Sequence, residues 1–194
     1  HGDVHTPYTT PSGNIHGMPV AAALHIDNLE CKRNDLDKET IQQWEKLKNV
    51  GFDGPKINAE DLIFVAVRDT EPEEEFIIEK QKIRSILVNE VREKGILGIF
   101  NEINDRLKDC DFVYVSFDVD SMDPKETSFG TGTPVDNGLM IDEARELIEN
   151  IVKMPNFGCF EMVEINPCLD EKRNKMADVS LTILETVIET IKNT

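Results

Sequence analysis

Residues 112–120 read Phe-Val-Tyr-Val-Ser-Phe-Asp-Val-Asp, an apolar run that ends abruptly in two carboxylates. The run is short and rich in β-branched and aromatic residues, so residues 112–117 predict a strand buried on both faces. Further apolar runs predict three more strands, at residues 62–67, 83–88 and 160–165. Apolar residues at helical spacing predict five helices, over residues 18–24, 38–48, 96–107, 144–151 and 184–191.

The alternation of strands and helices predicts an α/β fold, in which a mainly parallel sheet lies between two layers of helices. The carboxyl ends of parallel strands meet at one edge of the sheet, and ligands in such folds bind beyond that edge. Charged residues follow three of the predicted strands there: Arg68 and Asp69, Asp118 and Asp120, and Glu164. No repeat or linker divides the chain, so we expect a single domain over residues 1–194.

The composition argues against some classes of partner. The 194 residues include 38 Asp and Glu against 21 Lys and Arg, a formal net charge of −17. Such a surface repels phosphate backbones, which argues against nucleic acid and anionic membranes as partners and favours cationic small molecules. Solubility alone would explain the same excess.

The chain also lacks the signals of secretion and membrane insertion. No apolar run reaches the ~20 residues that a membrane helix needs, and the sequence does not begin with a signal-peptide pattern. The four cysteines are widely spaced, which is typical of free thiols in a reducing compartment. We therefore expect a cytoplasmic protein.

Three carboxylates crowd the end of the strand predicted at residues 112–117, namely those of Asp118, Asp120 and Asp123. Neighbouring acids repel one another and lose hydration energy unless a cation neutralises them. Asp118 and Asp120 are two residues apart, so an extended chain directs both to one face. A divalent metal ion explains this pattern, and an acidic turn held by backbone N–H groups explains it equally well.

The chain opens on a second group of possible ligands, His1-Gly2-Asp3-Val4-His5. A histidine and an aspartate two residues apart can bind zinc, manganese or iron, although this spacing alone is equally typical of a polar loop. The first residue is not Met, and no predicted helix or strand precedes it. We therefore expect residues 1–194 to be a fragment of a longer chain.

Residues 9–17 read Thr-Thr-Pro-Ser-Gly-Asn-Ile-His-Gly and predict an irregular loop. Its hydroxyl and amide side chains, Ser12 and Asn14 among them, can hydrogen-bond a carboxylate. His16 stands where this loop enters a predicted helix. Its imidazole suits proton transfer near neutral pH, although a lone histidine at such a position is more often a capping or packing residue.

Two more groups of acids are candidates for binding a cation. Glu164 follows an apolar strand and needs a cationic partner, which could be a structural Arg or Lys or a cationic ligand. Residues 69–75 read Asp-Thr-Glu-Pro-Glu-Glu-Glu. They predict a solvated charged loop, a few of whose acids could bind an ammonium group.

Taken together, these motifs resemble the ureohydrolase family, and within it the arginases. His1-Gly2-Asp3 resembles the latter part of the family's Asp-x-His-x-Asp motif, and residues 12–17 resemble its Ser-Gly-Asn-x-His-Gly loop. Residues 116–124 match the Ser-Phe-Asp-x-Asp-x-x-Asp-Pro signature. Glu164-Ile165-Asn166-Pro167 and Gly132-Thr133-Pro134 extend the resemblance over nearly the whole chain.

The resemblance implies an arginase/deacetylase-like fold without its N-terminal strands, and two Mn²⁺ ions per active site in the complete chain. It implies four metal ligands, His1, Asp3, Asp118 and Asp120, of which Asp118 would bridge the two ions. It implies three catalytic residues: Asp118, Glu164 beside the guanidinium, and His16 as a proton shuttle. The implied substrate-binding residues are His5, Ser12, Asn14, Glu71, Glu74, Thr133 and Glu164, with Ser12 and Asn14 at the α-carboxylate and Glu71 and Glu74 near the α-amino group.

The implied reaction is the hydrolysis of L-arginine to urea and L-ornithine by a metal-bridging hydroxide. Agmatine or a guanidino acid is an alternative substrate, because His5 replaces the usual Asn and Glu71 the usual Asp of arginases. A catalytically inactive, metal-poor homologue is the other alternative. The resemblance also implies a homo-oligomer, a trimer or a hexamer. Since the Asp that would stand two residues before His1 and the family's first metal-binding His are not among residues 1–194, we expect these residues alone to bind manganese poorly and to be nearly inactive.

Overall fold

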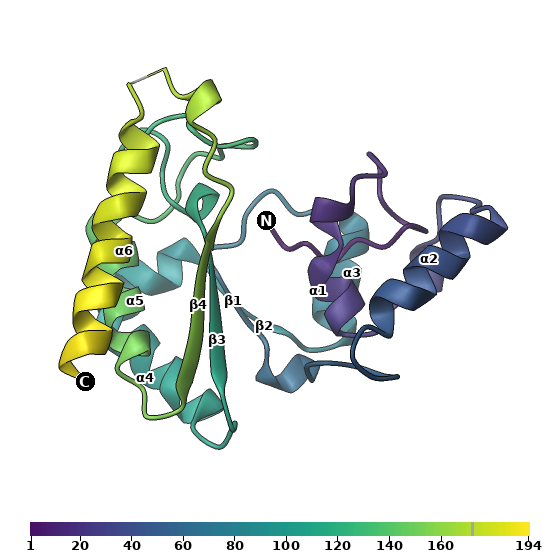
Figure 1. The fold of residues 1–194 in the computed structure, drawn as a ribbon, viewed down its shortest axis with the longest axis horizontal. Coiled ribbons are helices and arrows are strands. Elements are labelled where there is room, and N and C mark those ends of the chain that lie inside the picture. Colours follow the sequence, from purple (N-terminus) through teal and green to yellow (C-terminus); the bar gives the residue numbers. More distant parts are fainter. Residues whose placement is uncertain (172) are drawn as a thin grey trace. The chain divides into compact units, whose positions relative to one another are not determined.

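The computed structural model describes residues 1–171 and 173–194, which form two compact units (Figure 1). The first unit comprises residues 1–85 and the second residues 86–194. The first contains α1 (Pro19–Ala23), α2 (Lys38–Lys48), β1 (Ile63–Val65), α3 (Pro72–Lys80) and most of β2 (Arg84–Ile86). The second contains α4 (Val88–Leu107), β3 (Val113–Asp118), α5 (Ile141–Val152), β4 (Phe157–Val163) and α6 (Lys175–Asn193).

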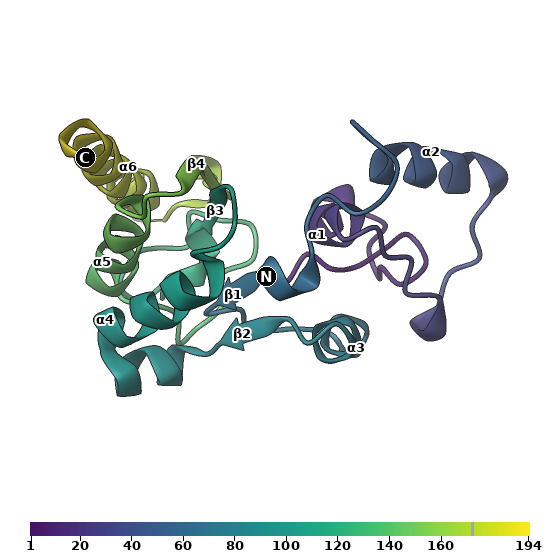
Figure 2. The same ribbon diagram turned by 90° about the horizontal axis from the view of Figure 1, so that it is seen from below.

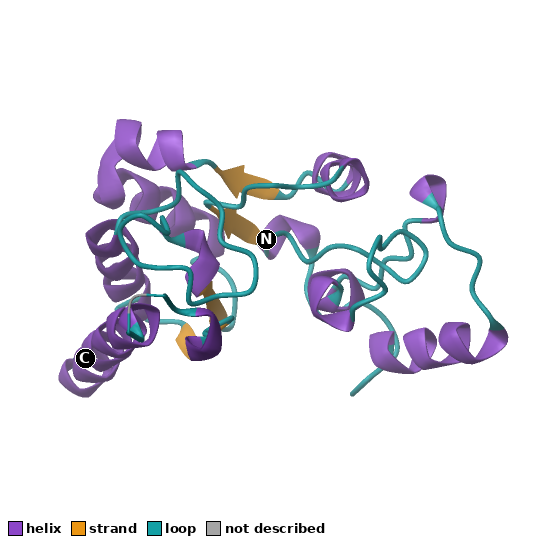
Figure 3. Ribbon diagram, turned by 90° about the horizontal axis from the view of Figure 1, so that it is seen from above, coloured by secondary structure: helices purple, strands orange, loops and turns teal. Residues whose placement is uncertain are grey.

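The second unit is an α/β unit built on a parallel strand pair. β3 pairs with β4, and Asp118 at the end of β3 lies opposite Val163 at the end of β4. Helices α4, α5 and α6 lie on the same side of this pair (Figures 2 and 3), and α5 contacts both of the other two. The parallel pairing agrees with the predicted fold class, and it brings the carboxyl ends of β3 and β4 to one edge.

The prediction that the strand at residues 112–117 is buried on both faces is wrong within this unit. In β3, Val113 and Phe117 are buried, whereas Tyr114 is 57% exposed. Successive strand residues point to opposite faces, and among the described residues of the second unit the helices cover only one face. Partial burial and the hydrogen bond to Glu161 together raise the pKa of the Tyr114 hydroxyl to about 12.

The sequence predicted a helix at the position of each helix of the second unit. The predicted first residue or the predicted buried face was wrong for some of them. α5 buries Ala144, Leu147, Ile148 and Ile151, as predicted. α6 buries the face that carries Met176, Ser180, Ile183, Val187 and Thr190. The apolar face predicted for it was only partly correct, since Val187 is buried whereas Ile188 and Ile191 are exposed.

Helix α4 begins earlier than the sequence predicted. Its first residue is Val88, which the apolar pattern had assigned to a strand. The Glu90 carboxylate accepts the backbone N–H of Leu87 at 3.2 Å and so caps the new start. Gly95 interrupts the helix with φ of 71°, a conformation that glycine adopts at little cost. The kink separates the predicted part of the helix from the part that the sequence analysis missed.

Helix α3 was not predicted, because its acids indicated a solvated loop. Pro72 stands at the first helical position, where its missing N–H costs nothing. Glu73, Glu74 and Glu75 lie in the first turn, where the helix dipole favours negative charge. Ile77 is buried in the core of the first unit and holds the helix there. The charge run is therefore a helix start rather than a loop.

The first unit has two apolar clusters. Val4, Leu24, Phe64, Ile77 and Ile83 form one of them. Met18, Ala21, Ala22 and Trp44 form the other, where α1 packs against α2. Helix α2 has the bounds that the sequence predicted. The helices of the described residues include none with the length and apolar character of a membrane span. None of the four cysteines forms a disulfide.

Asp27 satisfies two polar groups beside the second cluster. It accepts Trp44 Nε1–H at 2.8 Å and the Lys48 ammonium at 2.6 Å through its Oδ1 atom. The Lys48 side chain is 3% exposed and also contacts Glu45 at 2.8 Å. The position of α2 in the first unit therefore depends on one carboxylate.

We expect Asp27→Ala to lower the free energy of unfolding by about 2–3 kcal/mol, because it leaves a buried indole N–H and a buried ammonium without their shared acceptor. Urea denaturation followed by tryptophan fluorescence measures the change. Asp53→Ala, at an exposed position, is the control. A change below about 0.5 kcal/mol, the size of an ordinary surface substitution, would contradict the role given to Asp27.

Candidate metal and substrate site

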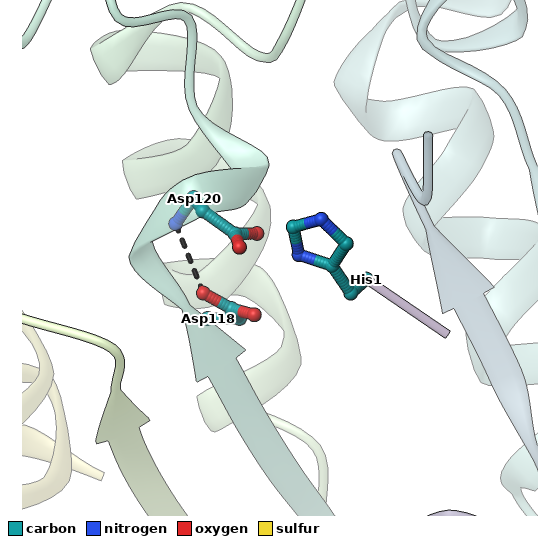
Figure 4. Close-up of side chains that lie close together, drawn as sticks. All are labelled: His1, Asp118 and Asp120. Carbon is teal, nitrogen blue, oxygen red and sulfur yellow. Dashed lines mark hydrogen bonds between the residues drawn. The ribbon is translucent and has the colours of Figure 1, made fainter. Parts of the chain in front are cut away.

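Two carboxylates lie together at the end of β3. Asp118 is its last residue, and Asp120 lies in the 3₁₀ turn Val119–Ser121 that follows directly. The backbone N–H of Asp120 donates to Asp118 Oδ1 at 3.0 Å (Figure 4). This bond caps the turn and keeps the two side chains near each other. Asp120 is only 4% exposed, so at least one acid of the pair is almost out of contact with water.

The surroundings of Asp118 disfavour its charged form. Burial, and after it the negative charge of Asp120, raise the pKa of this carboxyl to about 7. A cation between the two would reverse both costs, since it replaces lost hydration and cancels the repulsion. Carboxylate oxygens are hard donors of the kind that Mn²⁺, Mg²⁺ and Ca²⁺ prefer. The residues at the end of β3 therefore fit a divalent metal ion.

Asp123, the third carboxylate of the signature, has a structural role in the turn. It is 6% exposed, and its Oδ1 atom accepts the backbone N–H of Lys125 at 2.9 Å. Its own backbone N–H donates to Leu139 O at 2.8 Å. The alternative of an acidic turn held by backbone N–H groups thus applies to Asp123. It describes Asp118 and Asp120 only in part, because their carboxylates also face each other's charge.

Glu164 and Thr133 belong to the same edge of the second unit. Glu164 follows β4 directly, and the register places Val163 opposite Asp118. A Cβ atom on Gly132 would lie 3.8 Å from Glu164 Oε2. The hydroxyl of Thr133 donates to Asp120 Oδ2 at 3.5 Å. The parallel register therefore places Asp118 and Glu164 at one edge of the strand pair, and the hydrogen bond places Thr133 beside Asp120.

Glu164 adopts a conformation that is costly for a residue with a side chain. Its φ is 65°, in the left-handed region that non-glycine residues rarely occupy. Such strain costs on the order of 1–3 kcal/mol and persists only where the surroundings hold it. Here Asn166, two residues later, donates its backbone N–H to Gly130 O at 2.8 Å. The strained backbone conformation therefore occurs at Glu164, a residue that is expected to contact the substrate.

His1 and Asp3 lie in the first unit, on the segment that leads into α1. The carbonyl of Asp3 accepts the backbone N–H groups of Val20 and Ala21 at 3.1 and 3.4 Å, and so satisfies the start of that helix. Both His1 and Asp3 are half-buried. Their joining Asp118 and Asp120 in one metal site stays a prediction.

The loop of residues 9–17 has the irregular form that its composition predicted. The Thr10 hydroxyl accepts the backbone N–H of Gly13 at 3.1 Å, and the Ser12 hydroxyl accepts that of Asn14 at 3.2 Å. A short 3₁₀ turn, Ile15–Gly17, then leads to α1. Ser12, Asn14 and His16 are all exposed, so their polar side chains are accessible to a small molecule.

A cavity of about 720 Å³ lies in the first unit beside this loop. Ser12 and Gly13 lie at its wall, together with Trp44 and Leu47 of α2. Most of the residues around it are apolar, which does not suit a substrate carrying several charges. The cavity therefore does not enlarge the candidate site.

His5 lies in a cluster of charged residues in the first unit. Its Nε2 atom is 2.9 Å from Glu71 Oε2 and 3.8 Å from Glu74 Oε2. Its Nδ1 atom is 3.2 Å from the hydroxyl oxygen of Thr9. The sequence predicted Glu71 and Glu74 near one group of the substrate, but not the contact of His5 with either of them. The signal was present, because His5 and Glu71 are the two positions that depart together from the usual arginase residues.

The pKa of Asp118 predicts how the metal-free protein responds to pH. A carboxyl whose pKa rises from 3.8 to about 7 on folding stabilises the fold fully below pH 3.8 and loses that contribution as pH rises through 7. In the presence of a chelator we therefore expect the melting temperature to fall between about pH 4 and about pH 7, and to fall less in Asp118→Asn.

Asp142→Asn, which alters an exposed acid of α5, is the matched control for this pH series. It should keep the wild-type slope. Equal slopes in wild type and Asp118→Asn would show that Asp118 does not cause the pH dependence.

Known proteins match this chain over nearly all its length. A model described as "Arginase family" matches residues 1–189. The arginase of Bacillus caldovelox is 35% identical over 185 residues, which are 95% of this chain and 56% of the relative. The arginase of Bacillus subtilis (strain 168) is 31% identical over 188 residues, 97% of this chain and 57% of the relative. The chain thus spans a little over half the length of these relatives.

Solved structures give the same result. The crystal structure of Helicobacter pylori arginase aligns with a TM-score of 0.84 at 30% identity, over 98% of this chain and 62% of that one. The arginase of Bacillus subtilis aligns with a TM-score of 0.81 at 31% identity, over 97% and 59%. The α/β fold of the chain is therefore the arginase fold, and the chain belongs to the arginase family.

Proposed function

We propose that this chain carries the catalytic machinery of an arginase, a manganese-dependent enzyme that hydrolyses L-arginine to urea and L-ornithine. The observation that carries the proposal is the mutually repelling pair of a half-buried Asp118 and a buried Asp120, at the strand edge that also holds Glu164. Such a pair is explained by a bound divalent cation, and the motifs around it resemble those of arginases.

The residues that would hold the metal are His1, Asp3, Asp118 and Asp120, with Asp118 shared between two Mn²⁺ ions. When bound, the ions supply a hydroxide nucleophile at neutral pH. The Thr133 hydroxyl, which donates to Asp120 Oδ2, restrains the direction in which that carboxylate presents its oxygens.

The chain's own residues would position the substrate for attack. A guanidinium is resonance-stabilised and a poor electrophile, so its orientation matters. The Glu164 carboxylate, exposed beyond β4, accepts charge-assisted hydrogen bonds from it. Water adds to the guanidinium carbon, and the bond from that carbon to the side-chain nitrogen breaks once this nitrogen gains a proton. His16, exposed on its loop, relays that proton.

The amino-acid end of the substrate would meet the first unit. Ser12 and Asn14 donate to the α-carboxylate, which agmatine lacks, and the acids at the start of α3 attract the α-ammonium group. Agmatine or a guanidino acid remains the alternative substrate. The fold itself does not decide, because formimidoylglutamase of Bacillus subtilis and proclavaminate amidino hydrolase of Streptomyces clavuligerus share it at 23% and 21% identity, with TM-scores of 0.74 and 0.66.

The remaining proposals concern the setting of the enzyme. We propose that residues 1–194 form part of one catalytic domain, in a cytoplasmic homo-oligomer that acts on a cationic small molecule and not on nucleic acid or membranes. The weak manganese binding and low activity expected of residues 1–194 alone also stay a prediction. Activity is therefore best measured on the protein as its gene encodes it.

Urea release in the presence of Mn²⁺, with L-arginine and agmatine compared, tests the proposed function. We expect arginine to be preferred. Asp120→Asn should lower kcat/KM by about a hundredfold or more and lower the bound manganese, because it removes a charged donor. Asp142→Asn on α5 is the control and should change neither. Preference for agmatine would support the alternative substrate, and full metal content without hydrolysis of any guanidino compound would make the protein an inactive homologue.

His16→Ala tests the proton shuttle. We expect kcat to fall by about a hundredfold, within the ordinary range for a lost general acid, while the manganese content stays at the wild-type level. His25→Asn removes another imidazole of the first unit as a control. Loss of manganese in step with loss of activity in His16→Ala would show that His16 is structural.

A further inference from the structure

The proposed function leaves one arrangement in the first unit unexplained, the contact of His5 with Glu71. His5 is only 8% exposed, and both of its ring nitrogens are occupied. Nε2 faces Glu71 Oε2 at 2.9 Å and Nδ1 faces the Thr9 hydroxyl at 3.2 Å. The contact with Glu71 is a close charged approach rather than a hydrogen bond, and the Thr9 hydroxyl lies within hydrogen-bond distance of Nδ1. Both ring nitrogens of His5 therefore face groups of the protein.

Glu74 and Glu71, the two glutamates that contact His5, differ in how far a ligand can reach them. Glu74 is 5% exposed. Its Oε2 atom accepts the backbone N–H of Glu71 at 3.2 Å, and its Oε1 atom lies 3.5 Å from the backbone N–H of Val4. Glu74 is thus committed to the start of α3 and to the segment that leads into the loop of residues 9–17. It offers little surface to a ligand.

Glu71 is the acid of this cluster that a ligand can reach. Its side chain is 41% exposed, although its Oε2 atom is buried against His5. A glutamate side chain that moves freely loses rotamer freedom when it binds a ligand, and this loss weakens binding. The contact with His5 removes much of that freedom before any ligand arrives, so binding costs less.

His5 also joins this carboxylate to the loop that carries Ser12 and Asn14. Its backbone N–H donates to Gly17 O at 3.1 Å, which closes the base of that loop. One residue thus restrains both an exposed acid and a loop of exposed hydroxyl and amide groups. An α-amino acid carries a cation and an anion on one carbon, and it needs these two kinds of group at a fixed separation.

We propose that His5 is a positioning residue that holds Glu71 to receive the α-ammonium group of a guanidino amino acid, and that it does not contact the substrate itself. The inference rests on the proposed function and deepens it. It assigns the recognition of the ammonium group to Glu71 and gives Glu74 a structural task. It also explains why the two departures from the usual arginase residues occur together, since the side chains form one pair.

The test compares ligands that differ only in the ammonium group. The KM of L-arginine is measured beside the inhibition constant of desamino-arginine, in which hydrogen replaces the α-amino group. We expect His5→Asn to raise the KM of arginine about tenfold, because the Glu71 side chain must then be ordered when the ligand binds. The kcat should stay within about twofold, and the inhibition constant of desamino-arginine should not change.

Three further variants complete the experiment. His5→Gln retains a donor and should bring KM back to within about threefold of wild type; it also serves if His5→Asn does not fold. Glu71→Gln should raise the KM of arginine as His5→Asn does, and the double variant should add little, because both changes remove one interaction. His25→Asn should leave both constants unchanged.

The outcomes separate this inference from the function on which it rests. Equal weakening of arginine and desamino-arginine in His5→Asn, or additive effects of His5→Asn and Glu71→Gln, would overturn the pairing while wild-type urea release still stands. Failure of the wild type to hydrolyse any guanidino compound would overturn the proposed function and this inference together.

Discussion

The repulsion between two acids at the end of β3 is the constraint around which the second unit is arranged. The backbone bond from Asp120 to Asp118 keeps the carboxylates together, and burial, together with the charge of Asp120, raises the pKa of Asp118 to about 7. Nothing in folding alone favours such a pair, because each charge raises the cost of the other. The parallel register then brings Glu164 to the same edge. The arrangement makes physical sense if a cation completes it.

In the first unit, hydrogen bonds of polar groups stabilise the irregular segment that precedes α1. Asp3 satisfies the start of α1 through its carbonyl, and His5 closes the following loop through its N–H. The carboxylate of Glu74 accepts hydrogen bonds from two backbone N–H groups of the same unit. These bonds stabilise a segment that has little regular structure of its own. They leave the side chains of Ser12, Asn14 and His16 exposed for chemistry.

How well the sequence predicted each part depended on whether the signal was local. Residues 38–48 have helical apolar spacing and an Asp cap, and the predicted bounds were correct. The acids of α3 looked like a solvated loop because their benefit comes from the helix dipole, which charge counting ignores. The exposure of one side of β3 depends on which face of the strand pair the helices cover. The contact of His5 with Glu71 forms only when folding brings two distant segments of the chain together. Neither follows from residue spacing.

The central claim is that Asp118 and Asp120 are paired in order to hold a cation. Calorimetric titration of Mn²⁺ into the metal-free protein, as its gene encodes it, tests this most directly. The account predicts that wild type binds manganese with a raised melting temperature, and that Asp118→Asn loses both the binding and the rise. Undiminished manganese binding by Asp118→Asn would contradict it, because the buried acids would then owe their pairing to something other than a metal.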